Sequence, residues 1–201
     1  EDDAEKESRE ARDRKMLAHL ENADETTANN RYAANVTQLM VASAHGYILS
    51  VRRLIELKAD VTLQSDSGCT ALTMAAEEGN VKVLVELLQA CADPDDPNTV
   101  PSKEQRRLVN LAEKGVVTAL MRAAQNGYVE AVELLVAYGA DVDTNEEGDG
   151  ALGPTINRTA LHLAARTGHV SVIRFLIEQQ ADVMLKDKDH LTPLESAAKF
   201  G

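Results

Sequence analysis

The sequence predicts an all-α repeat solenoid, in which stacked helix-turn-helix units are joined by exposed connectors. The first observation is a block of constant length, which starts at a threonine and reaches an aspartate 23 residues later. Its four copies are Thr37–Asp60, Thr70–Asp93, Thr118–Asp141 and Thr159–Asp182. In each copy a leucine stands two residues after the threonine and a glycine nine residues after it. A fifth block opens at Thr192 and reaches its glycine at Gly201.

The second observation is where the length of the chain varies. Successive threonines are 33, 48, 41 and 33 residues apart, although the block itself never changes length. All extra residues therefore lie between an aspartate and the next threonine. A stacked core element cannot absorb an insertion, whereas an exposed connector can. We expect the blocks to form the core and two connectors to be enlarged, within 94–117 and 142–158.

Each block has the pattern of two short helices, as residues 70–93 illustrate. The hydroxyl of Thr70 is suited to cap the first helix, whose thin apolar side lies within 72–76. Gly79 breaks this helix, because a tight turn needs a residue that accepts a positive φ. Apolar residues at helical spacing over 81–88 predict a second helix with a wide apolar stripe. Helices this short are marginal alone, so each one needs its neighbours.

These blocks resemble the ankyrin repeat, whose pattern has T-P-L-H near its start, a glycine-histidine pair in its middle and G-A-D at its end. The stretches TALHLAARTGH and LLVAYGAD carry the resemblance, which covers about residue 37 to residue 201. It implies antiparallel helix pairs, with connectors forming β-hairpin fingers roughly perpendicular to them.

The chain also departs from the ankyrin pattern. Proline follows the threonine only at Pro193, and the glycine of G-A-D is present only at Gly139. Lys58, Cys91 and Gln180 replace that glycine elsewhere, so we expect them to take a left-handed backbone at a cost of ~1 kcal/mol each.

Both ends of the chain differ from a full repeat. Residues 1–15 are a charged N-terminal segment, which the sequence leaves open as a solvated helix or a disordered stretch. Residues 16–36 resemble the second helix of a repeat and the G-A-D stretch that ends it, and are interpreted as a half-repeat cap with its connector. The ankyrin repeat domain follows over 37–201, with repeats starting near 37, 70, 118, 159 and 192. The last repeat supplies only its first helix, so we expect either that the natural protein continues or that a disordered extension follows.

The connectors are predicted to differ from one another. Those over 61–69 and 183–191 have the length of an ordinary finger. In the first enlarged connector, Ser102 and Gln105 fit a capping box, which predicts a helix through Ala112 that is closed by Gly115 and packs on the array. The second enlarged connector is glycine-rich and acidic and is interpreted as a mobile loop. A larger binding surface and neutral drift at a tolerant site both explain it.

Composition and charge narrow the class of function. Lys and Arg number 21 against 33 Asp and Glu, and the resulting net charge of −12 argues against a nucleic-acid partner. The sequence has no apolar stretch long enough for a membrane span and no signal peptide. Cys69 and Cys91 are interpreted as unpaired thiols in a reducing compartment. We therefore expect a monomer without a membrane partner, located in the cytoplasm, with the nucleus as the alternative.

The sequence contains no phosphate loop, no paired histidines at metal spacing and no nucleophile motif. The stretch from Asp143 to Gly148 imitates the start of a calcium loop, but Pro154 stands where the loop needs a bidentate carboxylate. We therefore expect no catalytic residue, no metal and no cofactor.

Ankyrin proteins typically bind partners in a concave groove, made by finger tips and the exposed face of each first helix. Carried over by position, the resemblance implies a partner-binding surface of Ala44, His45, Asp66, Ser67, Cys69, Glu77, Glu78, Gln125, Asn126, Arg158, Arg166, Thr167, Lys188, Asp189, Leu191 and Lys199. It also implies that His162 and His169 hydrogen-bond the adjoining repeat. The groove is predicted to be acidic at repeat two and basic toward repeats four and five, which favours a partner of opposite charge order.

The leading hypothesis is a non-catalytic interaction module that binds a partner protein or peptide in that groove. The alternative is a regulatory or targeting arm of a larger multidomain enzyme, such as a kinase. A catalytic role for the segment itself has no residue support.

Overall fold

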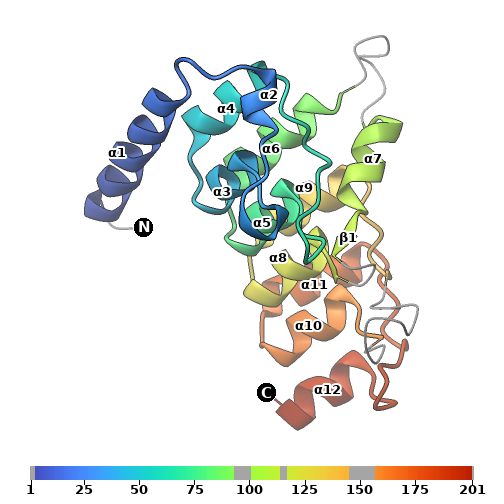
Figure 1. Ribbon diagram of the computed structural model, residues 1–201. Coiled ribbons are helices and arrows are strands. Elements are labelled where there is room, and N and C mark those ends of the chain that lie inside the picture. The colour runs from blue at the N-terminus through green and yellow to red at the C-terminus, as the bar shows by residue number, and fades with distance from the viewer. Residues whose placement is uncertain (1–2, 93–100, 114–116, 145–156, 201) are drawn as a thin grey trace.

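The computed structural model describes residues 3–92, 101–113, 117–144 and 157–200 as a stack of helix pairs (Figure 1). The first helix of each pair follows a repeat threonine. The pairs are α3 (Gln38–Ala44) with α4 (Ile48–Glu56), α5 (Ala71–Glu77) with α6 (Val81–Ala90), α8 (Ala119–Asn126) with α9 (Val129–Ala137), and α10 (Ala160–Arg166) with α11 (Val170–Glu178). The fifth repeat contributes its first helix, α12 (Pro193–Phe200).

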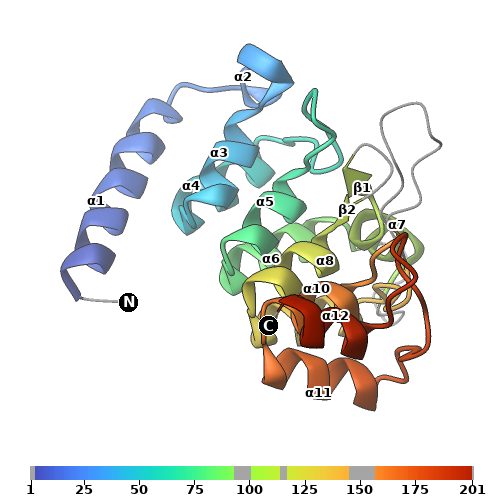
Figure 2. The ribbon, with the colours of Figure 1, turned by 90° about the horizontal axis from the view of Figure 1, so that it is seen from below.

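The helices are arranged in two rows (Figure 2). The first-helix row contains α3, α5, α8, α10 and α12, and each member packs on the next. The second-helix row contains α4, α6, α9 and α11, and begins with α1 (Asp3–His19), which packs on α4. At one position of each second helix a leucine is fully buried in the core, namely Leu54, Leu87, Leu135 and Leu176. The predicted all-α repeat solenoid is confirmed.

The repeat threonines cap the first helices as predicted. The hydroxyls of four of them accept a hydrogen bond from the backbone N–H three residues on, at 3.1 to 3.4 Å, namely Thr37, Thr70, Thr118 and Thr159. Thr192 does the same for Glu195, whose carboxylate accepts from the backbone N–H of Thr192 in return at 2.8 Å. Each cap satisfies a helix donor that has no partner inside the helix, which explains why every block starts at the same residue type.

The turn glycines are required for two reasons, as Gly79 shows. Its φ is +66°, a region that other residues rarely adopt. A Cβ at this position would also lie 2.6 Å from the ring of Tyr128, which belongs to the next repeat. At Gly168 the φ is +74°, but a Cβ there would meet nothing within 4 Å. Gly79 therefore serves both the turn and the stacking of repeats.

The left-handed helix exits occur at two of the three predicted positions. Lys58 has φ +61° and Gln180 has φ +66°, as expected. The prediction was wrong for Cys91, whose φ is −98°. Here α6 continues to Ala90, and the carbonyl of Cys91 accepts a hydrogen bond from the Ser102 hydroxyl at 3.2 Å. The chain leaves this repeat toward the enlarged connector, so the ordinary exit is not formed.

The first enlarged connector contains the helix α7 (Lys103–Val109). The predicted capping box is present, because Ser102 N–H donates to Gln105 Oε1 at 2.7 Å and Gln105 N–H donates to Ser102 Oγ at 3.2 Å. The side-chain amide of Gln105 also donates to the carbonyl of Leu88 in α6 at 2.9 Å, and Leu108 is buried. The helix therefore packs on the array as expected.

The predicted extension of this helix through Ala112 was wrong. The helix ends at Val109, and Ala112 pairs with Thr118 in an antiparallel ladder of β1 (Ala112–Glu113) and β2 (Val117–Thr118). Backbone pairing across the finger competes with helix extension and prevails here. Gly115, the predicted helix terminator, lies outside the described residues.

The end of α7 restores the register of an ordinary finger. Asn110 and Asn29 each stand eight residues before a repeat threonine. The side-chain oxygen of Asn29 accepts from the Asp60 N–H at 2.7 Å, and that of Asn110 accepts from the Asp141 N–H at 2.9 Å. The two asparagines therefore hold equivalent positions, which identifies 94–108 as the inserted residues.

The N-terminal segment is a helix over the described residues, which decides between the two alternatives left by the sequence. Within α1, Asp13 is only 4% exposed. Its carboxylate accepts from the backbone N–H groups of Leu49 and Ser50, each at 2.9 Å, and from the Ser50 hydroxyl at 2.6 Å. These are the first amides of α4, whose own N-cap residue Tyr47 contributes no side-chain bond. Asp13 thus caps α4 from a neighbouring helix.

Two short elements lead from α1 to the first repeat, namely α2 (Glu25–Ala28) and the 3₁₀ turn η1 (Ala33–Asn35).

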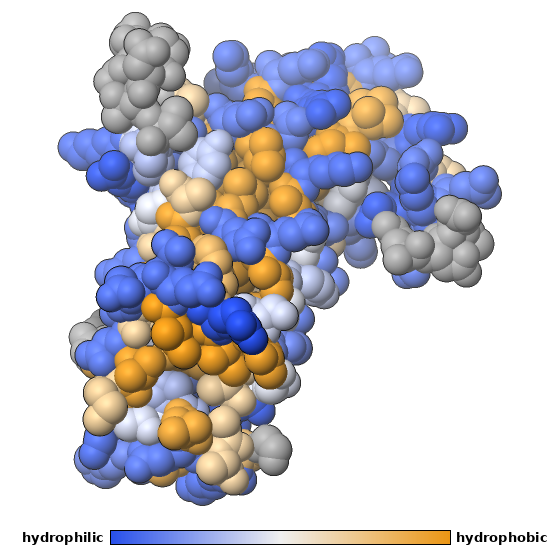
Figure 3. Space-filling view, turned by 180° about the vertical axis from the view of Figure 1, so that it is seen from behind, coloured by the Kyte–Doolittle hydropathy of each residue, from blue (hydrophilic) through white to orange (hydrophobic). Residues whose placement is uncertain are grey.

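The rear face of the molecule carries an apolar band between polar borders (Figure 3). Val170 of α11 is 65% exposed and Leu194 of α12 is 79% exposed, so apolar surface remains at the end of the stack. Within the described residues, no helix combines the length and apolarity that crossing a bilayer requires.

Candidate protein-binding surface

The predicted first-helix residues all lie at the C-terminal ends of the first-helix row. Most of them are exposed, namely His45, Glu78, Gln125, Asn126, Thr167 and Lys199. Three are half-buried, namely Ala44, Glu77 and Arg166. The side-chain amide of Asn126 donates to the carbonyl of Glu77 at 2.8 Å, so residues of adjacent repeats meet on this face.

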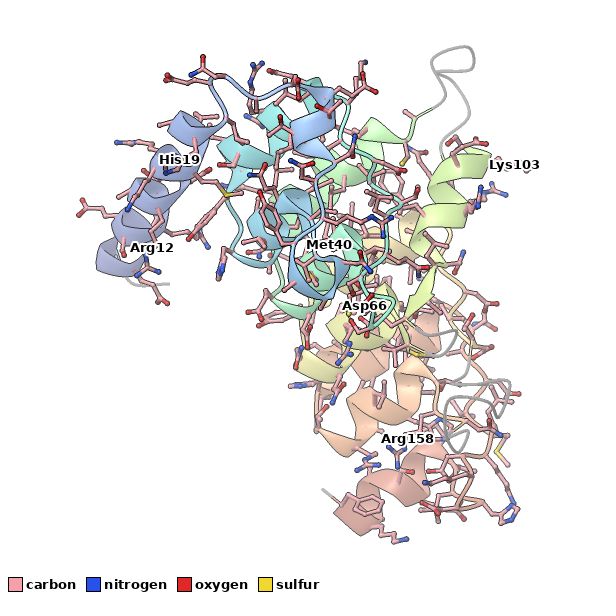
Figure 4. The ribbon with its side chains drawn as sticks, in the orientation of Figure 1. Arg12, His19, Met40, Asp66, Lys103 and Arg158 are labelled. Carbon is pink, nitrogen blue, oxygen red and sulfur yellow. The ribbon has the colours of Figure 1, made fainter. Side chains whose placement is uncertain are left out.

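The predicted finger residues lie on two equivalent turns and at the base of a third finger. In the ordinary fingers, Ser65 N–H donates to the Cys69 carbonyl at 3.0 Å and Asp187 N–H donates to the Leu191 carbonyl at 2.9 Å, at the same distance from the repeat threonine. Asp66, Ser67, Lys188 and Asp189 are exposed, whereas Cys69, Leu191 and Arg158 are half-buried. Asp66 and Arg158 lie at different levels of the stack (Figure 4).

A charged cluster at the middle of this face was missed by the sequence analysis. Arg122 of α8 lies 2.7 Å from Glu113 of β1 and 3.4 Å from Glu77 of α5. The hydrogen bond with Glu113 is the main cause that raises the pKa of the Arg122 guanidinium. Arg122 stands one helical turn before Gln125, so helical spacing was a signal that could have found it. The acidity predicted for repeat two is therefore partly neutralised within the array.

The cations at the other end of the face have different surroundings. Arg158 Nε lies 3.9 Å from the carboxylate of Asp187, which is 3% exposed. The guanidinium of Arg166 lies 4.4 Å from the centre of the Phe200 ring, and the ammonium of Lys199 lies 5.1 Å from it. Both distances permit cation–π attraction. Phe200, which follows Lys199 directly, was not among the residues predicted from the sequence.

The two histidines make the inter-repeat hydrogen bonds that were predicted. Nε2 of His162 lies 3.1 Å from the carbonyl of Leu191, and its Nδ1 lies 2.9 Å from the Thr159 hydroxyl. Because a carbonyl only accepts, Nε2 carries the proton and Nδ1 accepts. Burial lowers the pKa of His162. Nε2 of His169 lies 3.0 Å from the carbonyl of Gln125.

Two hollows in the described part of the chain lie away from the predicted surface. One, of about 360 Å³, lies between α7 and the end of α6 and includes Cys91. Another, of about 560 Å³, lies between α1 and the turns of repeats one and two. No predicted partner-binding residue lines either of them. Neither of these two hollows therefore supports a small-molecule site on the predicted surface.

The cysteines and the calcium-like stretch show no binding chemistry in the described residues. Cys69 and Cys91 are free, and burial raises the pKa of Cys91 to about 11, which leaves little thiolate at neutral pH. The carboxylate of Asp143 accepts from the Asp182 N–H at 2.9 Å, which gives it a structural partner. Residues 145–156, which include the rest of the calcium-like motif, lie outside the described residues.

A model of the ankyrin repeat family, built on three copies, matches the chain over residues 15–100, 39–146 and 120–201. Together with the capped helix pairs, this match shows that the chain belongs to the ankyrin repeat family. Ankyrin repeats imply a protein–protein interaction module, and domains built from them are generally non-catalytic.

The similar proteins are much longer than the parts of them that this chain matches. The Caenorhabditis elegans protein named Ankyrin repeat and KH domain-containing protein mask-1 is 30% identical over 186 residues, which are 82% of this chain and 6% of that protein. The E3 ubiquitin-protein ligase XBAT33 of Arabidopsis thaliana is 33% identical over 128 residues, 57% of this chain and 25% of the ligase. A probable E3 ubiquitin-protein ligase of Oryza sativa subsp. japonica, XBOS33, is 33% identical over 143 residues, 57% of this chain and 27% of that protein. The chain thus spans about a quarter or less of the length of these relatives.

Proposed function

We propose that this chain binds a segment of a partner protein along the face formed by the first-helix row and the finger tips. The observation that carries the proposal is the repeated contrast at the ends of the first helices. In repeat two, Ala76 is fully buried while Glu78 is exposed, and in repeat three Ala124 is fully buried while Asn126 is exposed. One side of each of these helix ends is therefore buried in the core, and the other side is exposed to a partner. Because the helices are already stacked, binding carries little ordering cost.

The charge of this face supports an oriented partner. Asp66 and Glu78 are exposed acids at repeat two, whereas Arg166 and Lys199 are cations at repeats four and five. A partner segment with the opposite charge order is favoured electrostatically. Because Glu77 forms an ion pair with Arg122, its substitution would also disturb the array, so Glu78 is the better residue for a test.

The test is affinity capture with the immobilised chain, comparing Glu78→Lys with Glu133→Lys. Glu133 is an exposed residue of α9 in the second-helix row, so the two variants have the same net charge but alter different faces. We expect Glu78→Lys to lose partners that wild type and Glu133→Lys both retain, and the difference to shrink as salt is raised. Equal capture by all three forms at low salt would count against this face.

A second candidate role is a regulatory or targeting arm of a larger multidomain enzyme. The observation that favours it is the small share of each relative that this chain covers, together with the ligase names of two of them. Those names favour a ligase over a kinase as the kind of enzyme concerned. Sequencing the complete open reading frame tests this role, since a frame without a catalytic domain would exclude it.

The two free thiols support a reducing compartment and hence a cytoplasmic setting.

A further inference from the structure

The most informative charged group on this face is Arg166, in the last turn of α10. Its Nη1 atom is buried and has no hydrogen-bond partner within the described part of the chain. Its guanidinium lies over the Phe200 ring at 4.4 Å, and Lys199 approaches the same ring at 5.1 Å. The cation–π contacts fix the position of the guanidinium, but they do not use its planar N–H donors.

The equivalent position of repeat two shows what this guanidinium lacks. Glu77 stands seven residues after its repeat threonine, as Arg166 does. There the charge is compensated within the array, because Arg122 reaches both Glu77 and Glu113. For Arg166 and Lys199, no ion pair with a carboxylate is present among the residues described. Two positive charges therefore meet at one ring, and neither forms an ion pair within the described part of the chain.

We propose that Arg166 and Lys199, together with Phe200, bind a side-chain carboxylate of the partner segment. A guanidinium offers parallel N–H donors that match the two oxygens of a carboxylate, and a charged hydrogen bond of this kind is stronger than a neutral one. The Phe200 ring, which is 46% exposed, gives an apolar surface for the methylene groups of the same acidic residue. This inference rests on the proposed function and names the chemistry of the partner at one end of the face.

The experiment is a selection from a phage-displayed library of random linear peptides, each fused to the phage through its C-terminus. The selected peptides then present neither a free terminal carboxylate nor a phosphate, so any carboxylate that is required must come from Asp or Glu. Selection is run on wild type, on Arg166→Glu and on Arg174→Glu. Arg174 is an exposed residue of α11 in the second-helix row, so its variant is the charge-matched control.

We expect wild type and Arg174→Glu to enrich the same peptides, with Asp or Glu at one fixed position. Arg166→Glu should bind those peptides at least about tenfold more weakly and should instead enrich peptides with Lys or Arg at that position. A wild-type pool without an acidic preference, or an Arg166→Glu pool identical to that of wild type, would overturn the inference.

Two further comparisons separate this inference from the proposed function. If the selected peptides are lost with Glu78→Lys but retained with Arg166→Glu, the proposed face is supported and the carboxylate site is rejected. Failure to enrich any peptide, or enrichment insensitive to both substitutions, would count against the face itself and with it this inference. If Arg166→Glu does not fold, Arg166→Gln gives the answer, because unchanged affinity for the selected acidic peptides would overturn the proposal.

Discussion

Two buried serines show how much the surroundings of a single hydroxyl matter in this stack. Ser43 of α3 and Ser50 of α4 are both fully buried. The hydroxyl of Ser50 donates to Asp13 at 2.6 Å, whereas that of Ser43 has no partner among the described residues. The other complete repeats have alanine at the position of Ser43, namely Ala76, Ala124 and Ala165. Ser43 is thus a polar residue at a buried position that the other complete repeats fill with alanine.

We predict opposite effects of the same substitution at these two sites. Ser43→Ala should raise the free energy of unfolding by about 1 kcal/mol, because it removes an unpaired buried hydroxyl. Ser50→Ala should lower that free energy by about 1–3 kcal/mol, because it leaves part of the Asp13 carboxylate unsatisfied. Denaturant titration followed by circular dichroism measures both, and changes of the same sign would contradict the assignment.

His162 is expected to make stability depend on pH. Burial lowers its pKa in the folded state, so the unfolded chain binds its proton more readily. The stabilisation is fully present above the unfolded pKa of about 6.5 and is lost as pH falls from there toward the lower folded pKa. In His162→Gln, unfolding free energies measured from neutral to mildly acidic pH should lose this part of the slope. An unchanged slope in the variant would exclude His162 as its source.

At the scale of elements, the attachment of α1 depends on one carboxylate. Asp13 accepts three hydrogen bonds from the start of α4, and few apolar residues of α1 are buried beside it. Removing a helix cap costs about 0.5–2 kcal/mol, and an unpaired buried donor adds to that cost.

We therefore predict that Asp13→Ala releases α1 from the second-helix row. Hydrogen exchange should become faster over Asp3–His19 and in the first turn of α4, while α8 and α9 keep their protection. Glu10→Ala, which removes an exposed ion pair with Arg14 in the same helix, is the control and should change little. Equal loss of protection in both variants would show that Asp13 is not the anchor.

The inserted residues 94–108 are predicted to be removable as a unit. Joining Asp93 to Val109 keeps Asn110, which contacts Gly139 and Asp141, and gives the repeat its ordinary length of 33 residues. We expect a folded array that is less stable by about 2 kcal/mol, because Leu108 no longer covers α6. Circular dichroism and denaturant titration check this outcome, and a variant without cooperative unfolding would contradict it.

The sequence predicted those elements whose causes are local and repeated. The capping threonine, the turn glycine and the apolar stripe each lie within one block, so the helix pairs could be placed by counting. Asp13 could not be assigned, because its donors Leu49 and Ser50 lie far along the chain and no second copy reveals a pattern. The end of α7 depended on pairing between Ala112 and Thr118, which competes with helix continuation in a way that local propensity does not show.

The same distinction applies to the candidate surface. Positions seven and eight residues after each threonine follow from helical register, and the structure places all of them at the ends of the first helices. The contact between Arg122 and Glu113 depends on where the insertion ends, so it required the three-dimensional arrangement. The contacts of Phe200 with Arg166 required knowledge of how α10 and α12 lie together.

At the scale of the whole molecule, stability should fall from the middle of the stack toward its ends. Each repeat contacts only its neighbours, so inner helices are held on two sides. α5 and α8 have a packed neighbour on each side within the first-helix row, whereas the described part of the chain gives α12 one such neighbour, α10. The exposed apolar residues Leu194 and Val170 mark the less covered end.

We predict that amide exchange in this chain is slowest in α5 and α8 and fastest in α12, because opening free energies follow the number of packed interfaces. Hydrogen–deuterium exchange read out by mass spectrometry measures the gradient. Uniform protection from α3 to α12 would show that the array unfolds as one cooperative unit instead.

The matched asparagines Asn29 and Asn110 have a consequence for any elongated ligand. Both make the same bond to the end of the following repeat, and α8 packs on α5 as α5 packs on α3, although 94–108 separate the two repeats in the sequence. A rigid rod-like ligand can therefore cross from repeat two to repeat three without a bend.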